Sequence, residues 1–336
     1  MENAIVRIPV GVMEERFTAV LLQQGFSADR ARQCAAIFTG NTIDGVYTHG
    51  VYRFPRFVEY IRKGVVVPGA EPTLVHSTGA LQQWNGNLGP GPLNAMHATN
   101  TAMKLSQQHG IGCVALANTN HWMRGGTYGW QAAKAGFVFI GWTNTTAIMP
   151  AWGAVNGKLG NNPLVLGLPY KDEAIILDMA MSQFSYGAME LSVLKNEKLS
   201  VFGGYDNKGE LSNDPAAILA SRRPIPIGYW KGAGLALLLD ILAAVLSGGL
   251  SVHEIAKKET ESSLSQVFIA IDITRLGSSS SVPQLIENII NDYHQSTAEE
   301  KKRISFPGER VLQTRKDNLQ HGVPVLEKFW NEVLAL

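Results

Sequence analysis

A histidine and an arginine four positions apart form the clearest candidate for chemistry in this sequence. They are His49 and Arg53, in the stretch YTHGVYR that begins at Tyr47. If Thr48 caps a helix, both side chains lie on one face of it, one turn apart. An imidazole that titrates beside a guanidinium suits a site that holds a carboxylate and exchanges a proton with the neighbouring oxygen. The alternative is a surface histidine and arginine at a helix start, and the spacing alone leaves both interpretations open.

A second polar stretch, NTNHWMRGG at residues 118–126, contains His121 and follows a run that resembles a buried strand. Polar side chains at a strand end, followed by glycines that allow close backbone approach, are typical of a binding loop. An ordinary strand-to-helix turn is the alternative interpretation of the same pattern.

Two segments are predicted to begin helices whose N-termini could bind an anion. Lys231 lies between Trp230 and Gly232 at the beginning of a long apolar segment, where free backbone N–H groups and the lysine can meet a phosphate. The stretch PGER at residues 307–310 offers another such start, with plain capping as its alternative. Asp240 lies inside the apolar segment, and we expect it to be a hydrogen-bonded structural carboxylate rather than a catalytic one.

The common catalytic and cofactor motifs are absent from the sequence. No G-x-G-x-x-G fingerprint follows a strand, no P-loop is present, and no G-x-S-x-G elbow marks a hydrolase. No pair of cysteines or histidines has zinc-ligand spacing, so we expect no metal site. Any enzyme encoded here therefore has a site outside these general classes.

The composition indicates a soluble protein that binds neither nucleic acid nor membrane. The 336 residues carry 29 Lys and Arg against 28 Asp and Glu, and no basic block appears. The charged fraction of 17% is below the ~25% of average domains. A low charged fraction suggests that much surface is buried, some of it between subunits. The longest apolar run, residues 234–246, is shorter than the ~20 residues of a membrane span, and the N-terminus shows no secretory leader. We expect a cytoplasmic protein, in which Cys34 and Cys113 form no disulfide framework.

Hydrophobic periodicity predicts an α+β fold, with helices at both ends and a strand-rich middle. In the first 65 residues we expect helices, one capped by Ser27 and a third capped by Thr48, with Pro55 near its start. We expect Ser182 to cap a helix that runs to Leu194, and the apolar helix at 232–246 to be buried. Further helices are expected at 93–109, 283–294, 308–319 and 325–334, and strands at 73–76, 80–84, 112–117, 137–142, 164–169, 175–179 and 266–273.

The changes of pattern divide the chain into three parts. We expect an N-terminal helical part over residues 1–72, which carries His49, and a sheet domain over 73–250. Residues 251–336 are expected to pack with the N-terminal helices.

Six motifs in this order resemble the type-2 malate/lactate dehydrogenase family over nearly the whole chain. They are DGVYTHGVYR at 44–53, NTNH at 118–121, GNNPL at 160–164, LDMAMS at 177–182, WKGAG at 230–234 and PGER at 307–310. The resemblance implies a nicotinamide-binding domain that is not a Rossmann fold but a mostly antiparallel sheet. It also implies a homodimer.

The resemblance further implies the NADH-dependent reduction of a 2-oxo acid to a 2-hydroxy acid, with NADPH as an alternative cofactor. By position, His49 is the proton donor and Arg53 holds the substrate carboxylate, while Thr48 and His121 line the same pocket. The cofactor-binding positions implied are Ala174, Ile175, Ile176, Leu177, Asp178, Met179, Ala180, Trp230, Lys231, Gly308, Glu309 and Arg310.

Local departures from the broad family pattern narrow the expected substrate. Thr48, Met123 and Met181 replace more common residues, and the runs NHWMRGGTYGWQAA and HGVYRFPRF are similar to the branch that reduces 2,3-diketo-L-gulonate. We expect Met123 and Trp152 to shape the substrate pocket. The alternatives are a reductase of another 2-oxo acid or of a cyclic imine acid, and a non-catalytic protein that binds a sugar acid or a nucleotide.

Overall fold

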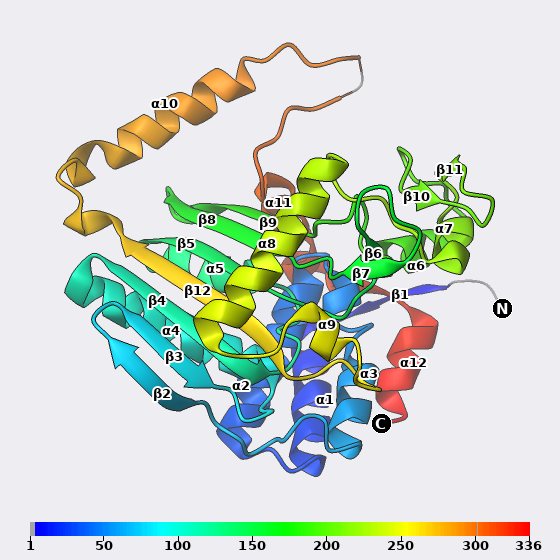
Figure 1. The fold of residues 1–336 in the computed structure, drawn as a ribbon, viewed down its shortest axis with the longest axis horizontal. Helices are drawn as coiled ribbons and strands as arrows, with labels where there is room; N and C mark the ends of the chain where they lie inside the picture. Colours follow the sequence, from blue (N-terminus) through cyan, green and yellow to red (C-terminus); the bar gives the residue numbers. More distant parts are fainter. Residues whose placement is uncertain (1–3, 301) are drawn as a thin grey trace.

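The computed structural model describes residues 4–300 and 302–336, and a seven-stranded sheet forms its centre (Figure 1). Every pairing in this sheet is antiparallel except that between β3 and β4, so the expected α+β fold with a mostly antiparallel sheet is confirmed. In spatial order the strands are β2 (Thr73–Thr78), β3 (Leu81–Asn85), β4 (Ile111–Thr119), β12 (Leu264–Asp272), β5 (Phe137–Thr143), β8 (Leu164–Tyr170) and β9 (Glu173–Met179).

The central strand of the sheet comes from late in the chain. β12 pairs with β4 on one side and β5 on the other, and it is buried along most of its length. A strand with neighbours on both edges and helices on both faces needs side chains that tolerate burial throughout. The sheet therefore extends past residue 250, where we expected the sheet domain to end.

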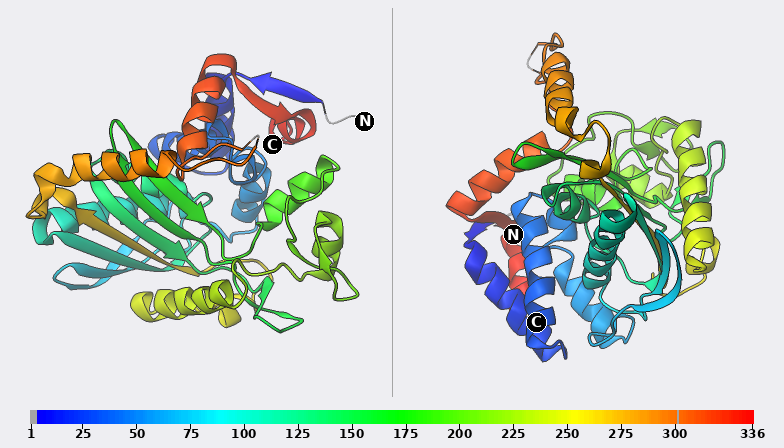
Figure 2. Two further views of the ribbon diagram at one scale, coloured as in Figure 1. Left: turned by 90° about the horizontal axis from the view of Figure 1, so that it is seen from above. Right: turned by 90° about the vertical axis from the view of Figure 1, so that its left-hand side faces the viewer.

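Helices cover both faces of the sheet (Figure 2). On one face, α4 (Gly91–His109) and α5 (Gly126–Lys134) pack around Phe268 of β12. On the other face, α8 (Trp230–Ser247) packs around Val267. Because neighbouring residues of a strand point to opposite faces, Val267 and Phe268 each anchor one of the two cores.

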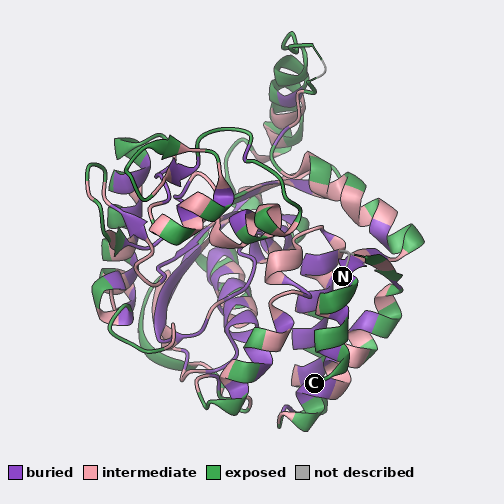
Figure 3. Ribbon diagram, turned by 90° about the vertical axis from the view of Figure 1, so that its right-hand side faces the viewer, coloured by how far each residue is buried: buried purple, intermediate pink, exposed green. Residues whose placement is uncertain are grey.

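A helical body joins the two ends of the chain beside the sheet (Figure 3). It contains α1 (Val10–Gln23), α2 (Ala28–Ile43), α3 (Phe54–Arg62) and α12 (Glu327–Leu334), and the strand β1 (Ile5–Ile8) pairs with β13 (Val323–Leu326) at its edge. Phe54 is fully buried in this body, with its ring centroid 4.1 Å from that of Phe17 and 5.2 Å from that of Phe38.

The segment between α2 and α3 differs from our expectation. Thr48 caps no helix: it lies in a 3-10 turn at Tyr47–His49, and α3 begins five residues after His49 with Pro55 in its first turn. The cause is anchoring to α2, because Asn41 Nδ2 donates to the carbonyl of His49 and the backbone N–H of Val51 donates to Thr42 Oγ1. These bonds keep the backbone of residues 49–51 out of an α-helix.

Three other expectations about helices are only partly met. Ser27 stands at the N-cap of α2 but its side chain makes no capping bond, and α6 (Tyr186–Leu194) is capped by Ser185 rather than Ser182, through a bond from Ala188 N to Ser185 Oγ. Contrary to prediction, α8 is not buried all round, because its outer face exposes a row of apolar side chains. These are Leu237, Leu238, Ile241, Leu242 and Val245.

By length and hydropathy, α8 is the one helix in the described residues that could also span a membrane, with 33% of that window buried. Its inner face packs on the sheet, as in the core helix of a globular domain. α10 (Val282–His294) projects from the rest of the molecule (Figure 1). The remaining elements are α7 (Pro215–Ser221), α9 (Val252–Ile255), α11 (Glu309–His321), β6 (Met149–Pro150), β7 (Gly157–Leu159), β10 (Gly204–Tyr205) and β11 (Leu211–Ser212).

Candidate active site

Two adjoining cavities open between the helical body and the sheet. The first, which we call the polar cavity, measures about 500 Å³ and is lined by His49 and Arg53 together with residues of α6 and of the segment before β12. The second, which we call the strand cavity, measures about 540 Å³ and runs along β9 to the start of α11. Both volumes fall within the range of about 300–1,000 Å³ typical of ligand sites. The residues that line both cavities are Thr48, His49, His121, Thr145, Asn161, Ser185 and Leu191.

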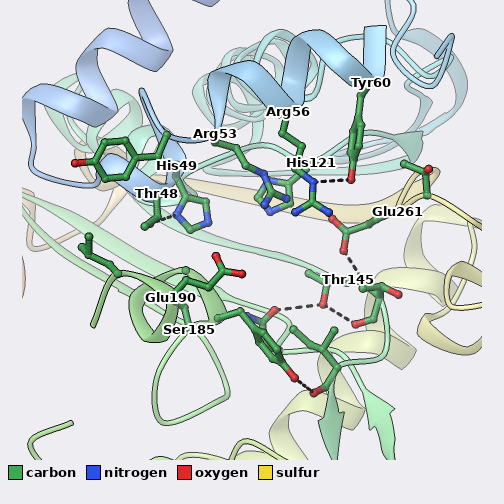
Figure 4. Close-up of a pocket in the computed structure, with 18 of the residues that line it drawn as sticks. Thr48, His49, Arg53, Arg56, Tyr60, His121, Thr145, Ser185, Glu190 and Glu261 are labelled. Atoms are coloured by element: carbon green, nitrogen blue, oxygen red, sulfur yellow. Dashed lines mark hydrogen bonds between the residues drawn. The ribbon is translucent and has the colours of Figure 1, made fainter. Parts of the chain in front are cut away.

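The junction of the cavities is formed by two stacked histidines (Figure 4). The ring centroids of His49 and His121 lie 5.6 Å apart with an interplanar angle of 27°. Nδ1 of His121 accepts a hydrogen bond from the backbone N–H of Met123 at 2.9 Å, so in the neutral ring the proton is on Nε2. Nδ1 of His49 lies 3.2 Å from Oγ1 of Thr48. The predicted grouping of Thr48, His49 and His121 is therefore present in the structure.

Burial sets the protonation of both rings. It lowers the pKa of His49 to about 3, with further lowering by His121, Arg53 and Arg124, and it lowers the pKa of His121 to about 3, with Arg53 adding to the effect. Both rings are neutral near pH 7 while the cavity holds no anion. A negative charge placed on Arg53 counteracts one of the causes and favours proton uptake by His49.

Arg53 is the N-cap residue of α3 and its guanidinium lines the polar cavity. Burial and the neighbouring Arg56 lower the pKa of Arg53 from its ordinary value, while Glu261 and Glu190 oppose that change. Within the part of the chain that the structure describes, no hydrogen bond or short ion pair engages this guanidinium. Its N–H donors are thus free to take a carboxylate in a bidentate arrangement.

Sequence reasoning missed much of the polar cavity. Its other polar side chains come from α3, the segment after β5, α6 and the segment before β12, and no local motif links them. They include Arg56, Tyr60, Thr145, Thr146, Ser185, Glu190, Lys258, Glu259, Thr260 and Glu261. Only the tertiary fold brings these segments together.

The strand cavity follows β9, which is an edge strand of the sheet. Of the seven predicted positions at 174–180, four line the cavity, namely Ile176, Leu177, Asp178 and Ala180. Ala174 is instead fully buried in the core beneath α5, and neither Ile175 nor Met179 is part of the lining. Because β9 is at the edge, one side of its backbone faces away from β8 and can bond a ligand.

Gly308 brings the start of α11 onto this strand. The backbone N–H of Ile176 donates to the carbonyl of Pro307 at 3.0 Å, and Gly308 has φ +93°. A Cβ at Gly308 would lie 3.2 Å from the nitrogen of Ile176, so a side chain here would be both strained and crowded. The close approach leaves backbone rather than side chains along this part of the cavity.

A buried ionic network forms the wall behind the strand cavity. Arg124 pairs with Asp44, Arg315 Nε lies 2.6 Å from Asp44 Oδ1, and Arg124 Nε lies 4.0 Å from a carboxylate oxygen of Asp178. Burial raises the pKa of Asp178, while Arg124 and the N–H of Gly126, which donates to Asp178 at 2.8 Å, lower it. The network links the helical body, the sheet and α11 at the cavity.

Some predicted site residues lie elsewhere. Trp230 and Lys231 form the exposed start of α8 and line neither cavity. Glu309 bonds the backbone N–H of Phe306 and pairs with Arg303, and Arg310 is exposed at the start of α11. Met123 lines the strand cavity, but Trp152 packs at 5.2 Å against Tyr229, outside both.

The strand cavity fits one end of a nicotinamide dinucleotide. Edge-strand backbone, the glycines 45, 125 and 308 in its lining, and direct continuity with the histidine pair suit a flat ring and ribose held by main-chain groups. Ile176, Leu177, Asp178, Ala180 and Gly308 would hold it. Among the described residues, no group of three His, Cys, Asp or Glu side chains could hold a metal ion.

Comparisons with known proteins identify the family of this chain. Residues 8–334 match the family model described as malate/L-lactate dehydrogenase. The chain is 41% identical to a 2,3-diketo-L-gulonate reductase of Pasteurella multocida, over 98% of this chain and 100% of that protein. It is 40% identical to a protein of the same name from Citrobacter koseri, over 96% of this chain and 98% of the other.

Solved structures confirm the fold. The malate dehydrogenase of Entamoeba histolytica superposes with a TM-score of 0.93 at 24% identity, covering 99% of this chain and 97% of that one. The malate dehydrogenase of Pyrococcus horikoshii gives 0.89 at 26% identity, covering 100% and 96%. The chain belongs to the malate/L-lactate dehydrogenase family of oxidoreductases, as its motifs predicted.

Proposed function

We propose that this protein is an NADH-dependent reductase of a 2-oxo sugar acid and converts 2,3-diketo-L-gulonate to 3-keto-L-gulonate. The observation that carries the proposal is the unengaged guanidinium of Arg53 in the same cavity as His49, directly beside a second cavity suited to a nicotinamide. The names of the relatives supply the substrate.

The proposed roles follow from the donors and acceptors present. Arg53 binds the C1 carboxylate and so fixes C2 near the two histidines. A reduced nicotinamide bound along β9 would supply the hydride that C2 accepts and would thereby be oxidised. His49 gives its proton to the C2 oxygen as negative charge develops there, which typically accelerates such steps by about 10²–10⁴-fold. The C2 carbonyl thereby becomes a hydroxyl. His49, which takes up a proton from solvent when the carboxylate binds Arg53, returns to the neutral form that it has in the empty cavity.

His121 supports this step without giving up a proton. Its Nε2–H is a fixed donor, because the backbone of Met123 occupies the other nitrogen. A neutral donor beside the reacting oxygen stabilises the charge that appears during transfer. Thr48 orients His49 through the contact between Oγ1 and Nδ1, which leaves Nε2 of His49 as the nitrogen that carries the transferred proton.

The exposed face of α8 supports a homodimer. Its five apolar side chains are each at least 45% exposed, and two such faces would cover each other. The start of the same helix carries Trp230 and Lys231, which line neither cavity of their own chain. If Trp230 and Lys231 bind the cofactor, they must therefore do so at the cavity of the partner subunit, which a dimer formed through α8 would allow.

The test of this proposal is the loss of NADH absorbance with the purified protein and a panel of acids. The panel contains 2,3-diketo-L-gulonate, pyruvate, oxaloacetate, a keto-pantoate-like acid and a cyclic imine acid, each assayed with NADH and with NADPH. We expect turnover of 2,3-diketo-L-gulonate with NADH to exceed that of all other pairs. Preference for another acid would replace the substrate and keep the family chemistry, whereas tight NADH binding without any turnover would favour a binding protein.

A further inference from the structure

Of the three carboxylates that line the polar cavity with the carboxylate-binding arginine, two act electrostatically on that arginine. Glu190 comes from α6 and Glu261 from the segment before β12, and both side chains reach the cavity that holds His49 and Arg53 (Figure 4). Both share this cavity with Arg53, so a ligand that Arg53 holds there lies in the same cavity as the two carboxylates. The reduction itself requires neither of them.

Neither carboxylate is neutralised by a short ion pair among the residues that the structure describes. Glu190 is exposed and its carboxylate makes no hydrogen bond with the described residues, whereas Glu261 uses Oε2 to accept from the backbone N–H of Thr146 at 3.0 Å. The nearby cations have other partners: Arg56 Nε donates to Tyr60 Oη at 3.1 Å, and Lys258 Nζ donates to Ser263 Oγ at 3.0 Å. Acceptor oxygens therefore remain for a ligand.

The charges of the cavity favour a substrate with one carboxylate. Arg53, Arg56 and Lys258 are balanced by Glu190, Glu259 and Glu261, and both histidines are neutral in the absence of an anion. One substrate carboxylate binds the guanidinium of Arg53. A second would add a like charge beside Glu190 and Glu261, whereas hydroxyl groups can donate to these oxygens.

We propose that Glu190 and Glu261 form a hydroxyl-accepting subsite that selects 2-oxo acids with a hydroxylated chain and rejects dicarboxylic acids. This inference rests on the proposed function and adds the chemical basis of its substrate choice. Carboxylates accept strong hydrogen bonds from hydroxyls, and a site built to bond a hydroxyl discriminates strongly against ligands that lack one.

A simpler role for the two carboxylates has a different consequence. If they only offset the charge of Arg53 and Arg56, their removal would strengthen or weaken the binding of every 2-oxo acid in the same direction. If they accept substrate hydroxyls, the effect depends on the tail of the substrate. The ratio of kcat/KM for two substrates separates the two roles.

The experiment compares wild type with Glu190→Gln, Glu261→Gln and the double variant. NADH oxidation is measured with 2,3-diketo-L-gulonate, pyruvate and oxaloacetate. Glutamine keeps the size of the side chain and, at 261, an acceptor for Thr146. We expect the kcat/KM ratio of diketogulonate to pyruvate to fall by about tenfold for each variant, from the loss of a charged acceptor. The ratio of oxaloacetate to pyruvate should rise by roughly fivefold as a like charge is removed.

Glu197→Gln, on the exposed segment that follows α6, is the matched control and should leave both ratios unchanged. Equal unfolding temperatures for all variants establish that the fold is kept. Unchanged ratios in an active protein would overturn the subsite alone. A common shift for all three acids would show that the carboxylates only tune Arg53. A wild type that reduces none of the acids would overturn the proposed function and the subsite together.

Discussion

The pH dependence of catalysis follows directly from the low pKa of His49. Burial, His121 and Arg53 lower that pKa to about 3, so at pH 7 only about one molecule in 10⁴ carries the donor proton before substrate binds. The rate of reduction at low substrate concentration should therefore be proportional to proton concentration. We expect kcat/KM for reduction to fall about tenfold per pH unit between about pH 5 and about pH 8.

The reverse reaction provides the internal control. Oxidation of the hydroxy acid uses neutral His49 as the base, and that form is fully populated over the same range, so kcat/KM for oxidation should be independent of pH. Because reduction consumes one proton overall, the two slopes must differ by one whatever the pKa of the donor. The pKa of His49 determines whether kcat/KM for reduction or kcat/KM for oxidation depends on pH.

The assay follows NADH absorbance in both directions, at constant ionic strength and with the enzyme-free loss of NADH subtracted. A flat profile for reduction, together with an oxidation rate that rises with pH, would mean that the donor is already protonated in the free enzyme. That result would refute the reasoning from burial of His49.

Three further predictions concern the substrate clamp, the buried network and the dimer. Arg53→Lys should raise KM for the oxo acid by about 10–100-fold with a smaller change in kcat, because the bidentate clamp is lost; an unaltered KM would count against the clamp. Asp44→Asn removes the short ion pairs of Arg124 and Arg315 and leaves the buried Arg124 only the 4.0 Å approach to Asp178, so it should lower the free energy of unfolding in urea by about 3 kcal/mol or more. Asp317→Asn, at an exposed pair, should cost less than about 1 kcal/mol, and equal losses would contradict the network's role. Leu238→Glu should convert a dimer to monomers in sedimentation velocity, and a monomeric wild type would rule out the proposed interface.

The sequence was sufficient for the parts of the site that lie within single motifs. His49, Arg53 and His121 come from two continuous stretches, and the structure places all three in the polar cavity. The antiparallel middle was also predictable, because short alternating runs and tight turns are local signals.

Other features depend on contacts that no local pattern records. The hydroxyl of Thr42, on the preceding helix, bonds Val51 and prevents the helix start expected at Thr48. Glu190 and Glu261 reach the cavity from segments 71 positions apart in the numbering. The length and apolarity of α8 did not indicate that one of its faces would be exposed on the single chain. A helix buried in a core and a helix with an exposed apolar face can show the same run of apolar residues.

The most direct test of the central claim is the turnover of 2,3-diketo-L-gulonate by His49→Ala, measured beside wild type at saturating NADH. NADH fluorescence titration of both proteins provides the binding control. The account predicts that kcat falls by about 10²–10⁴-fold while the affinity for NADH stays within about threefold of wild type. Unchanged turnover by His49→Ala would contradict the assignment of His49 as the proton donor.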